Sequence, residues 1–230
     1  MNKRNINLLL FSAFLALLVS VPILHLDKGV SIRAGWSQGP WHLIPFGADS
    51  LSQHYKDRYL VLDEKPLASL LQDSTRPLVM ILVDGWGVPY DERLLEADFQ
   101  MLGKKNVSYA VHKRIFQTTS FAESIEYGSD FKEGYILDSE DSAGCAKIDS
   151  LISEGSWNRI AWTVRGTREG DRDKLHKLLK GLSELAGKHP NVQFIIQGTH
   201  RPILGTPETR RKYQAPWVPA VFINCEPQTK

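Results

Sequence analysis

The stretch LVMILVDGWG, residues 78–87, is the part of the chain that predicts the fold. Its first six residues, Leu78–Val83, are all apolar, and such a run predicts a strand covered on both faces, as in a parallel sheet. Asp84 follows at the carboxyl end, where parallel sheets bind their ligands. Gly85 and Gly87 leave space for a cation or phosphate to approach this carboxylate. An aspartate that merely caps the turn is the alternative interpretation.

Strand and helix patterns alternate along the rest of the chain. Apolar runs predict further strands at residues 107–111, 159–164, 192–196 and 218–223. Helices are predicted at residues 91–102, 142–153 and 171–186, the first of them capped by Asp91. Strands that alternate with helices of this length predict an α/β domain with a mainly parallel sheet flanked by helices.

The N-terminal segment is the longest apolar run of the chain. Lys3 and Arg4 precede residues 8–26, whose only polar members are two serines and one histidine. About 19 helical residues span roughly 28 Å, close to the ~30 Å hydrocarbon core of a membrane. We therefore expect an uncleaved single-pass anchor in the cell membrane, with the folded domain on the exoplasmic (periplasmic or extracellular) side. A cleaved secretory signal peptide is the alternative.

These patterns divide the chain into three regions. Residues 1–28 form a membrane anchor or signal segment, residues 29–58 an irregular linker rich in Gly, Pro and Trp, and residues 59–230 the α/β domain. The formal net charge of +2 gives no basic excess for binding nucleic acid. Cys145 and Cys225 are too few for a disulfide framework or a cysteine-rich zinc module, and they leave open one disulfide or two free thiols.

A second candidate segment reads QTTSFAE at residues 117–123. Thr119 carries a hydroxyl beside the start of a helix, where free backbone amides can hold a phosphoryl group. Thr118 and Ser120 are its local rivals as the nucleophile. Ser120 and Glu123 also form a plain capping box, which needs no ligand.

Two further segments follow predicted strands. His200 lies in QGTHRP, directly after the strand at 192–196. Residues 165–172 form a charged loop punctuated by glycines, and its arginines either contact an anionic substrate or belong to a solvated turn. Because the carboxyl ends of parallel strands share one edge of a sheet, we expect Asp84, Thr119 and His200 to converge there.

Taken in order, these segments resemble the motifs of the alkaline phosphatase superfamily over about residues 77–224. Residues 82–88 (LVDGWGV) look like its first metal-binding motif, in the form found in cofactor-independent phosphoglycerate mutases and sulfatase-like hydrolases. Residues 119–123 (TSFAE) are similar to the nucleophile region of lipoteichoic acid synthase and phosphoethanolamine transferase relatives. The pattern before His200 resembles a metal-binding Asp-His pair, with Thr199 in the place of the aspartate.

This resemblance implies a membrane-tethered, metal-dependent hydrolase or transferase acting on phosphate or sulfate esters of a small molecule or lipid. It makes Thr119 the nucleophile, and Asp84 and His200 ligands of a divalent zinc, manganese or magnesium ion. The superfamily's further Asp and His ligands have no convincing counterpart, and three aspartates are candidate substitutes: Asp138, Asp141 and Asp149. A catalytically inactive relative, serving as an exoplasmic binding or scaffold module, is therefore the alternative.

Overall fold

The computed structural model describes residues 51–228 except 104, 115–117, 129–130, 132–133, 139–142, 168–169, 203–205 and 215. The predicted membrane segment at residues 8–26 lies outside the described residues. Within the part that is described, no helix is long and apolar enough to cross a membrane. One compact unit runs from Leu51 to Lys230, so it begins earlier than the domain boundary predicted at residue 59.

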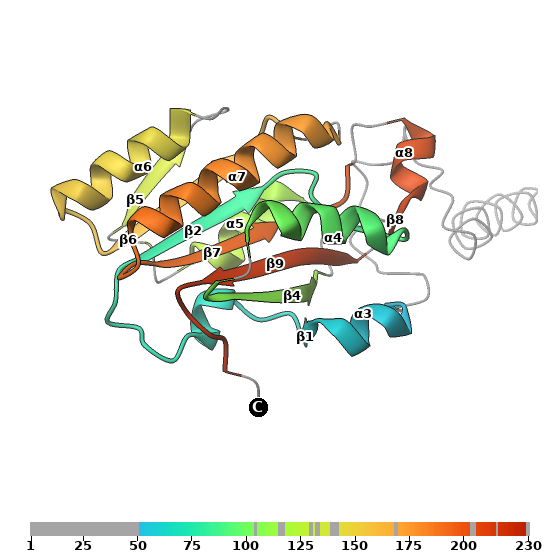
Figure 1. Ribbon diagram of the computed structural model, residues 1–230, viewed down its shortest axis with the longest axis horizontal. Coiled ribbons are helices and arrows are strands. Elements are labelled where there is room, and N and C mark those ends of the chain that lie inside the picture. The colour runs from blue at the N-terminus through green and yellow to red at the C-terminus, as the bar shows by residue number, and fades with distance from the viewer. Residues whose placement is uncertain are drawn as a thin grey trace, which may run out of the picture. The chain divides into compact units, whose positions relative to one another are not determined.

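Among the described residues, seven strands form one sheet at the centre of this unit (Figure 1). Their spatial order is β1 (Leu60–Leu62), β4 (Val107–Lys113), β9 (Trp217–Ile223), β7 (Gln193–Gly198), β2 (Leu78–Val83), β6 (Arg159–Val164) and β5 (Tyr135–Asp138). Neighbouring strands are parallel, except that β9 runs antiparallel to both β4 and β7. The predicted α/β class with a mainly parallel sheet is confirmed.

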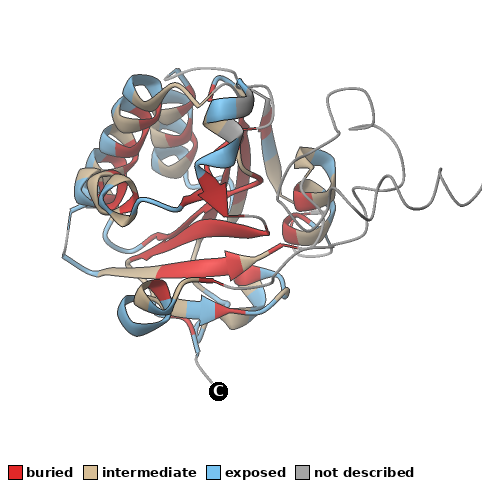
Figure 2. Cartoon of the chain, turned by 90° about the vertical axis from the view of Figure 1, so that its right-hand side faces the viewer, coloured by how far each residue is buried: buried red, intermediate tan, exposed pale blue. Residues whose placement is uncertain are grey.

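Strand β2 lies inside the sheet, between β7 and β6, and all six of its residues are buried. Side chains alternate along a strand. The odd-numbered residues of β2 therefore pack into one apolar core, and the even-numbered residues pack into a second core on the opposite face. Figure 2 shows the buried strands between partly exposed helices. The apolar run is uninterrupted because both faces of the strand are covered.

Helices supply the other half of each core. Leucines and aromatic residues of α4 (Glu92–Met101), α6 (Ala143–Glu154) and α7 (Arg172–Lys188) pack into the first core. The second core includes residues of α5 (Thr119–Glu126) and of the short 3-10 helix η2 (Leu67–Leu70). The observed bounds of α4, α6 and α7 differ from the predicted ranges by at most two residues at either end.

Local interactions explain where helices α4 and α7 begin and where α4 ends. Asp91 caps α4 by accepting a hydrogen bond from the backbone amide of Arg93. Asp171 caps α7 by accepting from the backbone amides of Asp173 and Lys174. After α4, Gly103 has a φ of +75°, the left-handed conformation that ends many helices and that glycine adopts without strain.

Several short elements have no counterpart in the sequence-based prediction. Edge strands β1 and β5 have only three and four residues, too few for a readable alternation. Strand β3 (Val88–Pro89) pairs antiparallel with β8 (Tyr213–Gln214), and α8 (Pro207–Arg211) precedes that ribbon. The two cysteines are free thiols that pack against opposite cores, Cys145 against the first and Cys225 against the second.

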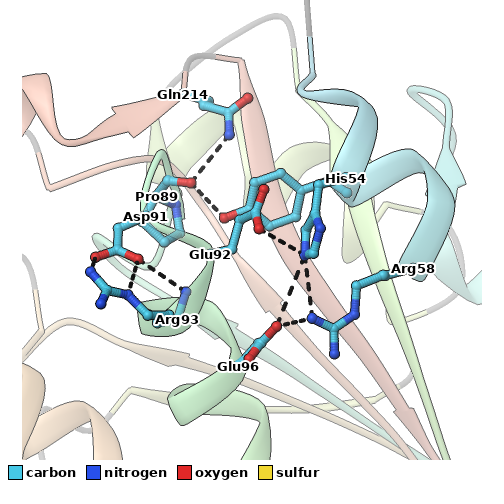
Figure 3. Close-up of polar contacts among 9 residues, drawn as sticks. His54, Arg58, Pro89, Asp91, Glu92, Arg93, Glu96 and Gln214 are labelled. Carbon is cyan, nitrogen blue, oxygen red and sulfur yellow. Dashed lines mark hydrogen bonds and ion pairs between the residues drawn. The ribbon is translucent and has the colours of Figure 1, made fainter.

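Helix α3 (Gln53–Arg58) lies inside the stretch predicted to be an irregular linker. Tyr55 anchors it, because its ring is fully buried and its hydroxyl donates to the carbonyl oxygen of Pro89 at 2.7 Å. Figure 3 shows the same helix facing the start of α4, where His54 Nε2 lies 2.9 Å from a carboxylate oxygen of Glu92. A single buried aromatic residue within a polar segment leaves no periodic signal, which explains why the helix was missed.

Two helical glycines provide a matched test of this packing. A Cβ added to Gly144 in α6 would lie 2.1 Å from a ring carbon of Trp162, whereas one added to Gly187 in α7 meets nothing within 4 Å. We expect Gly144→Ala to lower the free energy of unfolding by about 1–3 kcal/mol, because overpacking forces α6 away from the sheet. Gly187→Ala should instead stabilise the protein by about 0.4–1 kcal/mol. Urea unfolding measures both, and equal effects of the two variants would contradict this packing.

Candidate functional site

Three strand ends bring the predicted residues together at one edge of the sheet. Asp84 directly follows β2, and His200 lies two residues after β7. Thr119 is the first residue of α5, which follows β4 after a short loop. Strands β2, β4 and β7 all point the same way, because β4 and β7 each run antiparallel to β9. The predicted convergence of Asp84, Thr119 and His200 is confirmed by the contacts between them.

The carboxylate of Asp84 is the centre of this cluster, and it is fully buried. Its Oδ1 accepts a hydrogen bond from the hydroxyl of Thr119 at 2.6 Å and from the hydroxyl of Thr199 at 2.9 Å. His200 Nε2 lies 3.3 Å from the Thr119 hydroxyl oxygen and 4.0 Å from Asp84 Oδ1. Solvent reaches Thr119, which is only partly buried, whereas Thr199 and His200 are buried.

The orientation of His200 follows from its second ring nitrogen. Nδ1 lies 2.7 Å from the carbonyl oxygen of Arg201, and a carbonyl oxygen only accepts hydrogen bonds. Nδ1 therefore carries a proton, and in the neutral ring Nε2 presents its lone pair to Thr119. A histidine held through Nδ1 in this way is oriented as metal-binding and proton-accepting histidines usually are.

The backbone around Asp84 is fixed by contacts with both neighbouring strands. Its amide donates to Val164 of β6, and the amide of Thr199 donates to Val83 of β2. The hydroxyl of Thr167 donates to the carbonyl oxygen of Asp84. Thr167 is buried in the loop 165–172, whose arginines were candidates to contact an anionic substrate. The sequence gives no signal that a threonine in this charged, glycine-rich loop holds the backbone of Asp84.

Glycines allow the two site loops to touch. A Cβ on Gly198 would lie 1.8 Å from the carbonyl oxygen of Trp86, and a Cβ on Gly87 would lie 2.7 Å from Cα of Arg201. Gly85 has a φ of +73°, which places Asp84 and Trp86 on a sharp turn. The glycines after β2 therefore permit close backbone packing, a different role from the open space predicted for a ligand.

Thr119 is held at the start of α5 by a cap and by a buried ion pair. Thr118 is the N-cap residue, and its hydroxyl accepts from the amide of Phe121 at 3.3 Å. The capping box predicted from Ser120 and Glu123 is therefore wrong. The helix begins two residues earlier than that pattern requires, and Ser120 is exposed in its first turn.

The ion pair joins Arg114, just after β4, to Glu126, the last residue of α5, at 2.7 Å. Both side chains are buried. Burial raises the pKa of Glu126 to about 7, with the positive charge of Arg114 acting in the opposite direction. Burial and the same arginine lower the pKa of nearby His112 to about 3, so that ring is neutral at physiological pH. The ion pair therefore links the two ends of the segment 114–126, which carries Thr119.

A positive charge also lies beside this helix. Arg165 follows β6, and its Nη2 lies 2.9 Å from Oε1 of Glu123. Glu123 is four residues after Thr119, so the two side chains share one face of α5. Both partners of the pair are partly exposed. Arg165 can therefore meet an anion that approaches Thr119 from solvent.

The predicted metal ligands form an incomplete set. Asp84 and His200 lie together, but among the described residues no group of three or more His, Cys, Asp or Glu side chains could hold a metal ion. Asp149, one of the three candidate substitutes, is engaged elsewhere with His189, and His176 contacts Asp98. The side chains of the other two aspartates, Asp138 and Asp141, lie outside the described residues. One carboxylate and one imidazole, with the Thr119 hydroxyl, fit a single weakly held cation.

No protein-family model matches the chain, and no curated protein or solved structure matches it. The function is therefore argued from the chemistry of the site.

Removing the hydroxyl of Thr199 tests how the buried carboxylate is stabilised. Thr199→Val keeps the shape of the side chain but removes one of the two hydroxyl donors to Asp84 Oδ1. We expect it to lower the free energy of unfolding by about 1–3 kcal/mol, because a buried carboxylate oxygen then loses one of its two hydroxyl donors. Thr199→Ser keeps the donor and should retain most of the stability. Thermal and urea unfolding measure both, and equal losses would show that the hydroxyl is unimportant.

Proposed function

We propose that this protein is a hydrolase or group transferase acting on phosphate or sulfate esters, with Thr119 as its nucleophile. The observation that carries the proposal is the contact of the Thr119 hydroxyl with both the carboxylate of Asp84 and the imidazole of His200. A threonine hydroxyl is a weak nucleophile unless a base or cation lies beside it. Here two proton acceptors meet it at the start of a helix, and Thr119 is partly exposed to solvent.

The reaction would proceed in two displacements. In the first, Oγ1 of Thr119 forms a bond to phosphorus or sulfur, and its proton passes to Asp84 or His200. The ester oxygen leaves with the electron pair of its bond and takes a proton from water. In the second, water or an acceptor hydroxyl attacks phosphorus or sulfur and gives up its proton, the bond to Oγ1 breaks, and Oγ1 takes back the proton held by Asp84 or His200. Hydrolysis and transfer differ only in that second nucleophile.

Two features of the site suit a charged ester. Thr119 is the first residue of α5, and the positive end of the helix dipole there favours negative charge. Arg165 lies one helical turn away, held by Glu123. Together they can bind the non-bridging oxygens of a phosphate or sulfate, which every such ester presents whatever alcohol it carries. These groups suit a phosphorylated or sulfated substrate, and the superfamily resemblance supports a small molecule or lipid as the part that carries the ester.

A divalent zinc, manganese or magnesium ion would be held by Asp84 and His200, with Thr119 as an additional oxygen ligand. Such an ion, when bound, stabilises the deprotonated hydroxyl and the charge of the transferred group. The resemblance of the motifs to the alkaline phosphatase superfamily supports this part of the proposal. The same resemblance, with the apolar segment at 8–26, supports an enzyme tethered to the cell membrane on its exoplasmic side.

A binding or scaffold module is the second candidate function. It is favoured by one observation, the hydroxyl of Thr199 bonded to Asp84 where the superfamily's motif has a metal-binding aspartate. A carboxylate already satisfied by two hydroxyls has less need of a cation. In this alternative the fold would retain an anion-binding edge and lack catalysis.

Ester hydrolysis by the full-length protein separates the two candidates. We expect hydrolysis of a phosphate or sulfate monoester in the presence of zinc, manganese or magnesium. Thr119→Ala should lower kcat by at least about 100-fold, since the residue that forms the covalent bond is lost. Ser120→Ala is the matched control, because Ser120 is exposed in the same helical turn. Equal loss in both variants would contradict the nucleophile assignment, and inactivity of the wild type would favour the binding module.

Membrane attachment can be tested separately. The chain should remain in the membrane pellet after alkaline carbonate extraction, because about 19 apolar residues suffice to span the hydrocarbon core. Added protease should reach the folded domain from the exoplasmic side and not from the cytoplasmic side. Release of the intact domain into the soluble fraction would contradict the anchor and support a cleaved signal peptide.

A further inference from the structure

Trp86 connects the two loops that form the candidate site. It lies two residues after Asp84, and its side chain is buried. Its carbonyl oxygen packs so closely on Gly198 that a Cβ there would lie 1.8 Å away. Gly198 is the residue before Thr199, which donates to Asp84. The position of Trp86 therefore sets the distance between the Asp84 loop and the loop that carries Thr199 and His200.

The indole of Trp86 is held by a carboxylate outside the site. Its Nε1 donates to Oδ2 of Asp98 in α4 at 3.1 Å. The other oxygen, Oδ1, lies 2.6 Å from Arg172 Nη2 and 2.8 Å from His176 Nε2, both in α7. Asp98 is 1% exposed, and burial raises the pKa of its carboxyl, with Arg172 and His176 acting in the opposite direction.

Stability alone is a weak reason for burying this carboxylate. A buried ion pair often stabilises a fold no better than apolar residues of the same size. Around Asp98, α4 and α7 already pack against each other through the leucines of the first core. The carboxylate of Asp98 accepts from Trp86, Arg172 and His176. Because the other two donors fix the carboxylate, it holds the indole in one orientation.

We propose that Asp98 is a positioning residue for the candidate site, acting through Trp86. Its carboxylate fixes the indole, the indole fixes the turn at residues 84–87, and the turn keeps Asp84 in contact with Thr119 and Thr199. The catalytic consequence rests on the proposed function, but the positioning itself does not. Asp98 touches none of the reacting groups, so its effect on them must pass through the backbone of this turn.

Hydrogen exchange tests the positioning without any activity. The amides of Asp84 and Thr199 donate to Val164 and Val83, and these bonds report whether the two loops stay closed. In full-length protein, Trp86→Phe and Asp98→Asn should each speed exchange of these two amides at least about tenfold. Exchange in α6 should stay unchanged, which separates local opening from global unfolding. Asp149→Asn is the matched control, because Asp149 also pairs with a histidine and a cation but contacts no residue of the site.

A double-mutant cycle tests the route. If Asp98 acts through the indole, the Trp86→Phe/Asp98→Asn double variant should be no more impaired than the worse single variant, both in exchange and in kcat. We expect each single variant to lower kcat at least about tenfold with KM changed less than about twofold. Additive losses, or normal exchange and kcat in Trp86→Phe, would overturn the proposal and leave Asp98 a purely structural group. If the wild type hydrolyses no ester, the proposed function fails. The double-mutant cycle measured by hydrogen exchange still tests whether Asp98 positions the loops through Trp86.

Discussion

The buried carboxylate of Asp84 is the constraint on which the arrangement of this edge depends. A charged oxygen away from water is strongly unfavourable unless donors surround it. Here the donors are hydroxyls from two other segments, Thr119 at the start of α5 and Thr199 after β7. If either segment moved away, the carboxylate would lose one of these two hydroxyl donors. One polar group at the end of the most apolar strand thus determines where two distant parts of the chain must lie.

Close packing of backbone on backbone makes this arrangement possible. Gly87 and Gly198 lie where a Cβ would collide with the opposite loop, so the loops after β2 and β7 touch directly. Trp86 lies between them and is held from the other side by Asp98. The site is therefore supported by the core helices and not only by its own loops, although loops carry Asp84, Thr199 and His200. This support is what a preorganised hydroxyl nucleophile requires.

The two opposing interpretations of the site both depend on the contacts of Asp84. The contact of Thr119 with Asp84 and His200 suits covalent catalysis, and the bond from Thr199 to Asp84 suits a carboxylate that needs no metal. In the catalytic interpretation, Arg165 and the helix terminus supply positive charge that the incomplete ligand set lacks. In the other interpretation, the same charges make an anion-binding surface.

Elements with a local signal could be predicted from the amino-acid sequence. They are the uninterrupted run of β2, the capped leucine-rich α7, and the polar residues Asp84 and His200 at the ends of buried strands. The hydrogen-bond partners of the site residues could be read only from the folded structure. It placed the cap of α5 at Thr118 and not at Ser120, brought Thr167 to the carbonyl of Asp84, and joined Trp86 to Asp98. Periodicity reveals which residues are buried because burial repeats with the geometry of a helix or strand. A hydrogen bond between distant residues leaves no such repeat, because it depends on how whole elements pack.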